Sequence, residues 1–143
     1  MAIKFSESVR NARLNAIETT GGTSCSLEIR SGTVPTSCAT APPDGAVLAT
    51  MDLPTPSWMA DAASGVKGLS GTWQDTSADA ATTTTATYFR IYSSQSTKNQ
   101  TTCIIQGTVS ATGGGGDLTL SSASISPGQT VTITQFDLTD GNS

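Results

Sequence analysis

The side chains best suited to chemistry in this chain are three cysteines (Cys25, Cys38 and Cys103) and eleven carboxylates. A nucleophile needs an adjacent base, and the chain contains no histidine, the side chain that most often serves as general base and as metal ligand. The cysteine spacing lacks the close Cys or His pairs of a zinc site. We therefore predict a protein that is not an enzyme and that uses no metal and no cofactor.

The three cysteines leave two redox states open. One is three reduced thiols, the ordinary state of a protein that stays in the cytoplasm. The other is a single disulfide that forms after release into an oxidising medium. Cys38 lies in a predicted loop and Cys103 begins a predicted strand, so these two are the favoured pair. Cys25 shares a strand face with Leu27 and Ile29, and we expect it to be buried.

Two other patterns resemble ligand sites only superficially. Asp75 with Asp79, and Asp137 with Asp140, offer carboxylates, but their spacing matches no calcium-binding loop. The glycine run 113–116 lacks the Lys-Ser/Thr pair and the helix that follow a phosphate-binding loop. We predict solvated loop carboxylates and a tight or flexible connection.

Composition favours strands and argues against several partners. Charged residues make up 13 % of the 143 residues, about half the usual share, while Ser and Thr fill roughly 30 %. The net charge of −4 and the scattered basic residues predict no nucleic-acid binding. No apolar run reaches membrane-spanning length, so we predict no membrane partner. The N-terminus lacks a signal-peptide pattern, which predicts synthesis in the cytoplasm.

One helix is predicted, over residues 5–19. Its apolar residues recur every three or four positions, at Phe5, Val9, Leu14 and Ile17 among others. Ser6 or Ser8 can cap its start, and the Gly21–Gly22 pair ends it. Since so short a helix is marginal alone, we expect residues 1–22 to form an anchor that docks on its own domain or on a neighbouring subunit.

The strongest strand signal is a β-hairpin between Thr87 and Val109. Aromatic and β-branched residues form both arms, and the connection 93–102 is wholly polar. Strand alternation places Phe89 and Ile91 on the predicted core face. We expect the opposite face to meet water or a partner; its side chains are Tyr88, Arg90 and Tyr92.

The remaining chain predicts an all-β domain over residues 23–143. Strand-like segments occupy residues 23–31, 46–53, 66–74, 117–120 and 130–137, with bulges expected in 66–74 and near 134–135. A proline-rich loop spans 32–45. The spacing of seven or eight short strands predicts an antiparallel two-sheet sandwich, either Ig-like or jelly-roll-like, with one short N-terminal helix.

Several stretches resemble a family of small structural proteins of tailed-bacteriophage virions. The resemblance covers nearly the whole chain and involves no catalytic motif. It lies in the opening residues 1–19, in Gly71-Thr-Trp-Gln-Asp-Thr-Ser-Ala-Asp-Ala80, Phe89-Arg-Ile-Tyr92, the 107–109 and 113–116 region, and the segments 130–133 and 138–142.

This resemblance implies a virion component that is made in the host cytoplasm and acts by assembly. The expected partners are the major capsid protein or another virion protein, and further copies of the chain in a trimer or dimer. We expect capsid decoration or cementing first. Two alternatives stay open: a neck, collar or tail-fibre component, and a carbohydrate-binding module that uses the rings of Tyr88, Tyr92, Trp58 and Trp73.

Overall fold

The computed structural model describes residues 2–141 of the chain. Met1, Asn142 and Ser143, at the outer ends of the predicted segments 1–22 and 23–143, lie outside the described residues. The fold is mostly β with one helix, α1 (Glu7–Gly21). The strands are β1 (Ser26–Arg30), β2 (Val47–Asp52), β3 (Val66–Gly68), β4 (Trp73–Asp75), β5 (Thr84–Thr85), β6 (Tyr88–Tyr92), β7 (Cys103–Ala111), β8 (Leu118–Leu120), β9 (Ser124–Ile125), β10 (Val131–Ile133) and β11 (Asp137–Thr139).

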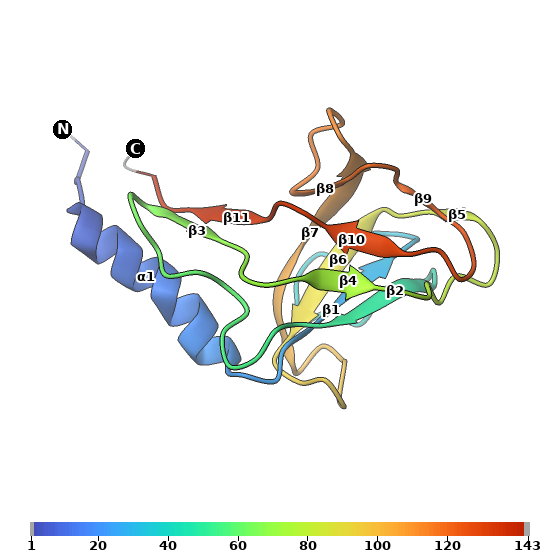
Figure 1. Ribbon diagram of the computed structural model, residues 1–143. Helices are drawn as coiled ribbons and strands as arrows, with labels where there is room; N and C mark the ends of the chain where they lie inside the picture. The colour runs from blue at the N-terminus through green and yellow to red at the C-terminus, as the bar shows by residue number, and fades with distance from the viewer. Residues whose placement is uncertain (1, 142–143) are drawn as a thin grey trace.

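The caps of helix α1 are among those that its sequence predicts, although the helix spans residues 7–21 and not 5–19. The N–H of Val9 donates to the Ser6 hydroxyl, 3.4 Å away, so Ser6 is the N-cap. Gly22 follows the helix with φ of 79°, a conformation that residues with a side chain rarely adopt. Its N–H donates to the carbonyl oxygen of Glu18 and so caps the helix. The helix lies along β3 of the same chain, at one end of the molecule (Figure 1).

The largest sheet is curled and has the strand order β2-β1-β6-β7-β8 (Figure 1). The predicted hairpin is present, because β6 and β7 pair antiparallel from Tyr88↔Thr108 to Tyr92↔Cys103. β8 departs from the prediction: it pairs with β7 in parallel, from Val109↔Leu118 to Ala111↔Leu120. The expectation of purely antiparallel pairing is therefore wrong for this strand.

Three two-stranded ribbons complete the fold: β10–β4, β11–β3 and β5–β9. The predicted strand at 66–74 is interrupted and supplies β3 and β4, while the segment that starts at 130 supplies β10 and β11. Both interruptions fall in segments where the switch of apolar parity indicated a bulge. The second half of each segment therefore pairs in a different ribbon from the first.

Aromatic side chains pack at the centre of the core. Trp73 has its ring centroid 5.4 Å from that of Phe136 and 6.1 Å from that of Trp58, and Phe89 meets Phe136 edge-on at 5.5 Å. Both Trp side chains are fully buried. The indole N–H of Trp73 donates to the carbonyls of Trp58 and Ser70, so burial leaves it no unpaired donor.

The central strands β1 and β6 are buried on both faces. The loop 31–46, which contains the predicted proline-rich segment, packs on the face opposite the core through hydrogen bonds to β6 and β7. The half-buried alternation predicted for residues 23–31 is therefore wrong within β1, where Ser26 and Glu28 are buried as well as Leu27 and Ile29.

Candidate functional site

Helix α1 attaches to the rest of the chain through a polar face. Its members recur at the helical spacing of four, four and three residues: Glu7, Asn11, Asn15 and Glu18. Their side-chain oxygens accept backbone N–H groups within the segment 58–65 at 2.9 to 3.1 Å. The helix thus supplies acceptors to a largely irregular segment, whose N–H groups would otherwise lack partners. We call these four residues the polar ladder.

A buried ion pair closes the C-terminal end of the polar ladder. The Lys67 ammonium is fully buried and lies 2.9 Å from Glu18 Oε2. It also donates to Asn15 Oδ1 and to the carbonyl of Ala60, so all three of its protons have acceptors. Such a pair is costly to bury but strongly destabilising to break. We assign it to helix docking rather than to catalysis.

The electrostatics of Glu18 agree with this structural role. Burial alone would raise the pKa of its carboxyl group, but hydrogen bonds from Lys67, Ser57 and the Met59 N–H outweigh burial and hold the pKa below its ordinary value. Glu18 is therefore ionised at neutral pH and is a poor general base. The ion pair stabilises the charged form.

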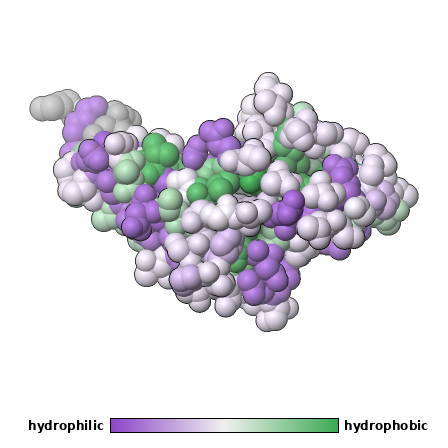
Figure 2. All heavy atoms as spheres, in the orientation of Figure 1, coloured by the Kyte–Doolittle hydropathy of each residue, from purple (hydrophilic) through white to green (hydrophobic). Residues whose placement is uncertain are grey.

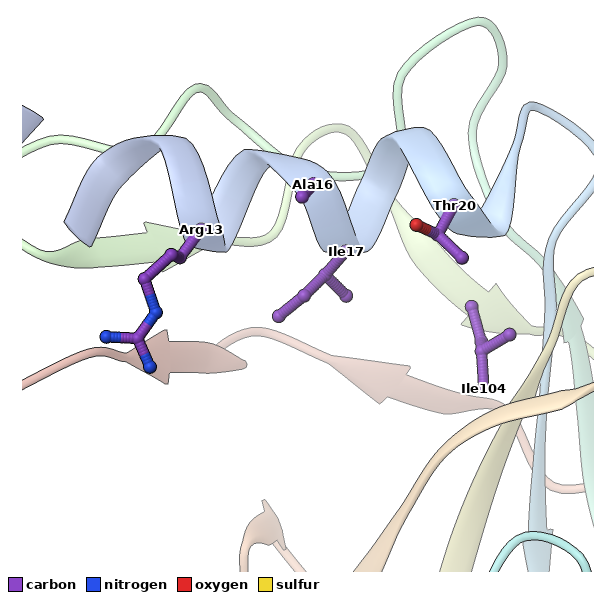
Figure 3. A pocket seen from close by; sticks show the side chains of 5 residues that line it. All are labelled: Arg13, Ala16, Ile17, Thr20 and Ile104. Carbon is purple, nitrogen blue, oxygen red and sulfur yellow. The ribbon is translucent and has the colours of Figure 1, made fainter. Parts of the chain in front are cut away.

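A groove lies on another side of the same helix. Its lining consists of Arg13, Ala16, Ile17 and Thr20 of α1 and Ile104 of β7, and Figure 3 shows Ile104 below the helix near Thr20. These residues enclose about 300 Å³, and the lining is predominantly apolar. Ile17 and Ile104 are only partly buried and pack against the core. We call this hollow the α1 groove, and it has room for one or two apolar side chains of another molecule.

The α1 groove continues toward the C-terminal ribbon. A neighbouring hollow of about 280 Å³ shares Arg13 and Ile17 and adds Leu14, Thr139 and Asp140. Arg13 forms an ion pair with Asp140 at 3.2 Å, and its guanidinium also lies 5.1 Å from the centre of the Phe5 ring. The two hollows therefore adjoin along one side of α1: the first is predominantly apolar, and the second has a mixed lining that includes the charged pair.

Strand β7 presents a partly unpaired edge beside this groove. Its partner β8 covers only Val109 to Ala111, and Asp117 accepts the N–H of Thr108 at 2.8 Å. In the described part of the chain, no strand pairs with that edge of β7 at residues 103–107. An exposed strand edge is a template for adding an extended peptide.

Apolar residues also reach the surface at the N-terminal end. Ile3, Phe5 and Val9 are 80 %, 44 % and 41 % exposed. In the orientation of Figure 2, hydrophobic residues reach the surface over the β3–β11 ribbon, whereas hydrophilic residues gather on α1. Of the predicted helix contacts, Phe5 and Val9 are therefore partly exposed, Ile17 lines the α1 groove, and Leu14 is buried at 4 % exposure.

The predicted contact face of β6 is not a surface, and that expectation is wrong. Tyr88, Arg90 and Tyr92 are at most 1 % exposed. Arg90 donates to the carbonyls of Ser37 and Thr40, at 3.0 and 2.6 Å, which brings loop 31–46 over the face. The sequence could not show this cover, because the loop comes from a distant part of the chain.

Polar partners satisfy the two tyrosines in this buried layer. The Tyr92 hydroxyl donates to Glu28 Oε2 at 3.1 Å, and burial together with that carboxylate raises its pKa. The Tyr88 hydroxyl accepts from Arg30 Nε at 3.1 Å. Since Trp58 and Trp73 are also fully buried, the four rings expected to bind sugar have no open faces. The carbohydrate-binding hypothesis loses the residues on which it depended.

The structure brings the favoured cysteine pair together. Cys38 Sγ and Cys103 Sγ lie 2.7 Å apart, one in loop 31–46 and the other at the first residue of β7. Cys25 is fully buried, as predicted, and its thiol donates to Gly21 O at 3.3 Å. Within residues 2–141, no three or more His, Cys, Asp or Glu side chains gather as a metal site would require.

Sequence reasoning missed the polar ladder and the α1 groove. The ladder spacing of 7, 11, 15 and 18 is visible in the sequence, but only apolar positions of the helix were considered. The groove depends on Ile104, whose position in a strand gave no indication that helix α1 packs beside it. A search for polar residues at helical spacing would have found the first feature and not the second.

Comparisons with known proteins provide no relative. The chain matches no protein-family model, and neither the curated proteins nor the solved structures contain a significant match. Among the described residues, no helix has the length and apolar character needed to cross a membrane. The function must therefore be argued from the geometry and from the resemblance in the sequence.

Proposed function

We infer that this protein is a non-enzymatic structural component of a bacteriophage virion, and specifically a decoration or cement protein on the outer shell of the head. Its α1 groove and the neighbouring β7 edge would hold a segment of the major capsid protein. In this proposal, the curled sheet forms one layer of a two-sheet sandwich, Ig-like or jelly-roll-like, and the two-stranded ribbons form the other layer.

The observation that carries the proposal is the combination of an apolar groove with an unpaired strand edge. An extended segment could add its backbone to β7 at residues 103–107 and place an apolar side chain between Ile17 and Ile104. Backbone pairing would supply affinity and the groove would select the side chain. Because a shell repeats the same contact many times, each contact can be weak if copies of this chain associate as a dimer or trimer.

The resemblance of the sequence supports the same class of protein. The stretches that carry it include residues 1–19, which overlap helix α1 from Glu7 onward, and 107–109, which lie in β7, the strand that supplies Ile104 to the groove. The low charge and high Ser and Thr content also fit a small β module that acts by binding. Each of these arguments supports a structural role, and none requires a reactive side chain.

The test separates heads from tails of the parent phage on a density gradient and measures this 14.5-kDa chain in each fraction. We expect an amount stoichiometric with the major capsid protein in the heads. A few copies confined to the tail or neck fraction would contradict decoration and favour the neck or tail alternative. Absence from both fractions would contradict a virion role.

A matched pair of variants then tests the α1 groove. Ala16 is exposed and lines the groove, so Ala16→Arg fills it without touching the core. Ala12 is exposed on the same helix, one turn earlier, and does not line the groove. We expect Ala16→Arg to weaken head binding by at least about tenfold, the equivalent of one lost apolar contact, and Ala12→Arg to leave it unchanged. Equal binding by both variants would exclude the α1 groove as the attachment site.

A further inference from the structure

We propose that Cys38 and Cys103 are a site of oxidative modification, at which an intramolecular disulfide fastens loop 31–46 to the start of β7. The modification requires an external disulfide such as oxidised glutathione as the oxidant. Cys25 stays a thiol throughout. The inference does not depend on the proposed virion role, because it rests only on contacts within the chain.

The fold brings the two thiols together across 65 residues of sequence. Cys103 Sγ lies 2.7 Å from Cys38 Sγ. Cys38 belongs to the connection between β1 and β2, whereas Cys103 opens β7, at the far side of the hairpin. No local turn forces this contact, so the tertiary structure alone creates it.

Hydrogen bonds hold loop 31–46 in place on both sides of Cys38. Arg90 Nη2 donates to the carbonyls of Ser37 and Thr40, at 3.0 and 2.6 Å. Gln106 Nε2 donates to the carbonyl of Pro35 at 2.6 Å. Both donors project from the β6–β7 hairpin that also carries Cys103. The approach of Cys38 is therefore fixed by three bonds, and it does not rely on the thiols themselves.

Arg90 is fully buried, and its charge acts on Cys103. Its Nη1 is buried and has no hydrogen-bond partner among residues 2–141. Burial and the hydrogen bond to Cys38 raise the pKa of Cys103 to about 12, while the charge of Arg90 opposes that rise. A buried cation next to a thiol is suited to stabilise the thiolate while it attacks.

The reaction is thiol–disulfide exchange and balances without a further reagent. One cysteine loses its proton, and its sulfur attacks oxidised glutathione, which forms a mixed disulfide and releases one glutathione thiolate. The second cysteine loses its proton and attacks the protein sulfur of that mixed disulfide, which releases the other glutathione. Two protein thiols are oxidised to one disulfide, oxidised glutathione is reduced to two thiols, and the two protons pass to the two glutathione thiolates.

Cys25 is excluded by its surroundings. Its side chain is fully buried and its thiol donates to the carbonyl of Gly21. Burial, with a smaller contribution from Glu18, raises its pKa to about 11. Because the pKa of Cys103 is also raised, accessibility makes the difference: Cys38 and Cys103 are partly exposed, whereas Cys25 is fully buried. A thiol that external disulfides cannot reach reacts slowly. The odd number of cysteines therefore gives one specific pair and one inert thiol.

The experiment incubates the reduced, folded full-length protein with oxidised glutathione at a mildly alkaline pH, about 8.5, where thiolates are more abundant. The protein is then unfolded, alkylated and weighed. We expect the number of alkylated thiols to fall from three to one. Three alkylated thiols after prolonged incubation would overturn the proposal.

Trypsin can identify the linked pair, because cleavage after the basic residues separates all three cysteines. Cys25 falls in the peptide 14–30, Cys38 in 31–67 and Cys103 in 99–143. We expect a reducible conjugate of 31–67 with 99–143 and a free, alkylated 14–30. A conjugate that contains 14–30, or a disulfide-linked dimer of whole chains, would overturn the assignment without needing any variant.

Three serine variants complete the test. Cys38→Ser and Cys103→Ser should each abolish the conjugate, whereas the control Cys25→Ser should retain it. Because the disulfide closes a loop of more than sixty residues, we expect oxidation to raise the Tm of the wild type and of Cys25→Ser by about 10 °C, and to leave the Tm of Cys38→Ser unchanged. An equal rise in Cys38→Ser would show that the stabilisation comes from elsewhere.

Discussion

Helix α1 and the body of the protein are held in place by different forces. The body has an aromatic core in which Trp58, Trp73, Phe89 and Phe136 are buried and in mutual contact. The helix buries only Leu14 and Gly21. It is attached by the polar ladder, whose oxygens accept N–H groups of the segment 58–65, and by the buried Lys67 ammonium.

This difference shows that the helix completes the backbone hydrogen bonding of a segment that has little strand pairing. Between Trp58 and Gly65 the chain has only isolated bridge pairings, Met59↔Leu69 and Ala63↔Val66. Without the helix, several buried or half-buried N–H groups would lose their acceptors, at about 1–3 kcal/mol for each neutral group. The Lys67 ammonium would keep the carbonyl of Ala60 and lose its two partners on the helix. Apolar burial should therefore govern global unfolding, and the polar ladder should govern local opening of the helix.

Truncating the core should have the largest effect. We expect Trp73→Ala to lower the free energy of unfolding by about 3–5 kcal/mol, because it removes a fully buried indole and its contact with Phe136. Denaturant unfolding measures the loss, with the slope compared to check that the transition stays two-state. Trp73→Phe keeps a ring and should lose clearly less. A loss below about 1 kcal/mol for Trp73→Ala would refute the central role of the aromatic core.

Breaking the ion pair should have the next largest effect, confined to the helix. We expect Glu18→Ala to cost about 3 kcal/mol in helix docking, because the buried Lys67 ammonium loses its carboxylate partner. The N–H groups of Trp58 and Met59 lose their acceptor as well. Hydrogen exchange should accelerate at those two amides and stay unchanged in β6. The matched control is Glu7→Ala, at the exposed end of the polar ladder, which should cost below about 1 kcal/mol. Equal acceleration throughout the chain would contradict separate local opening.

Local signals explain what the sequence predicted well. Ser6 and Gly22 bound the helix through their own capping geometry, and the hairpin follows from two apolar arms around a polar connection. The parallel pairing of β8 could not be predicted in this way. Gly113 and Gly115, with φ of 87° and 78°, turn the chain back within six residues, and Asp117 fixes the return through Thr108. Parallel strands usually need a much longer crossover.

Burial by distant segments explains why the predicted exposed face of β6 is wrong. Tyr88, Arg90 and Tyr92 have the alternation of an outward face, and only loop 31–46 makes that face internal. The same non-local packing placed Cys38 beside Cys103, where the sequence suggested a pair but gave no distance. On the helix, apolar periodicity singled out Ile17, which lines the α1 groove, but it gave no role to polar positions such as Asn15, which accepts the N–H of Ala62.

The pH dependence of helix docking should identify Glu18 as the group that matters. Its folded-state pKa is lowered, so the stability it contributes is fully present above the unfolded value of about 4.3 and is lost as pH falls through the lower folded value. We expect the Trp58 and Met59 amides to lose protection progressively below pH of about 4. Glu18→Gln should flatten this dependence. A variant that keeps the wild-type profile would assign the transition to another carboxylate.

The side of α1 that faces the α1 groove should contribute least to stability. A variant on this side therefore tests whether attachment to a partner is separate from the docking that the polar ladder provides. Ala16 is exposed and Arg is nearly as good a helix former as Ala, so Ala16→Arg should change the free energy of unfolding by less than about 0.5 kcal/mol. Protection of the Trp58 and Met59 amides should also stay as in the wild type, since the polar ladder is intact. Ala12→Arg is the control for an added charge.

If Ala16→Arg instead opened the helix as Glu18→Ala does, the α1 groove would be part of the packing that folds the protein. If it leaves folding intact and removes head binding, stability and attachment reside on separate sides of one helix, and the α1 groove beside Ile17 is retained for a partner.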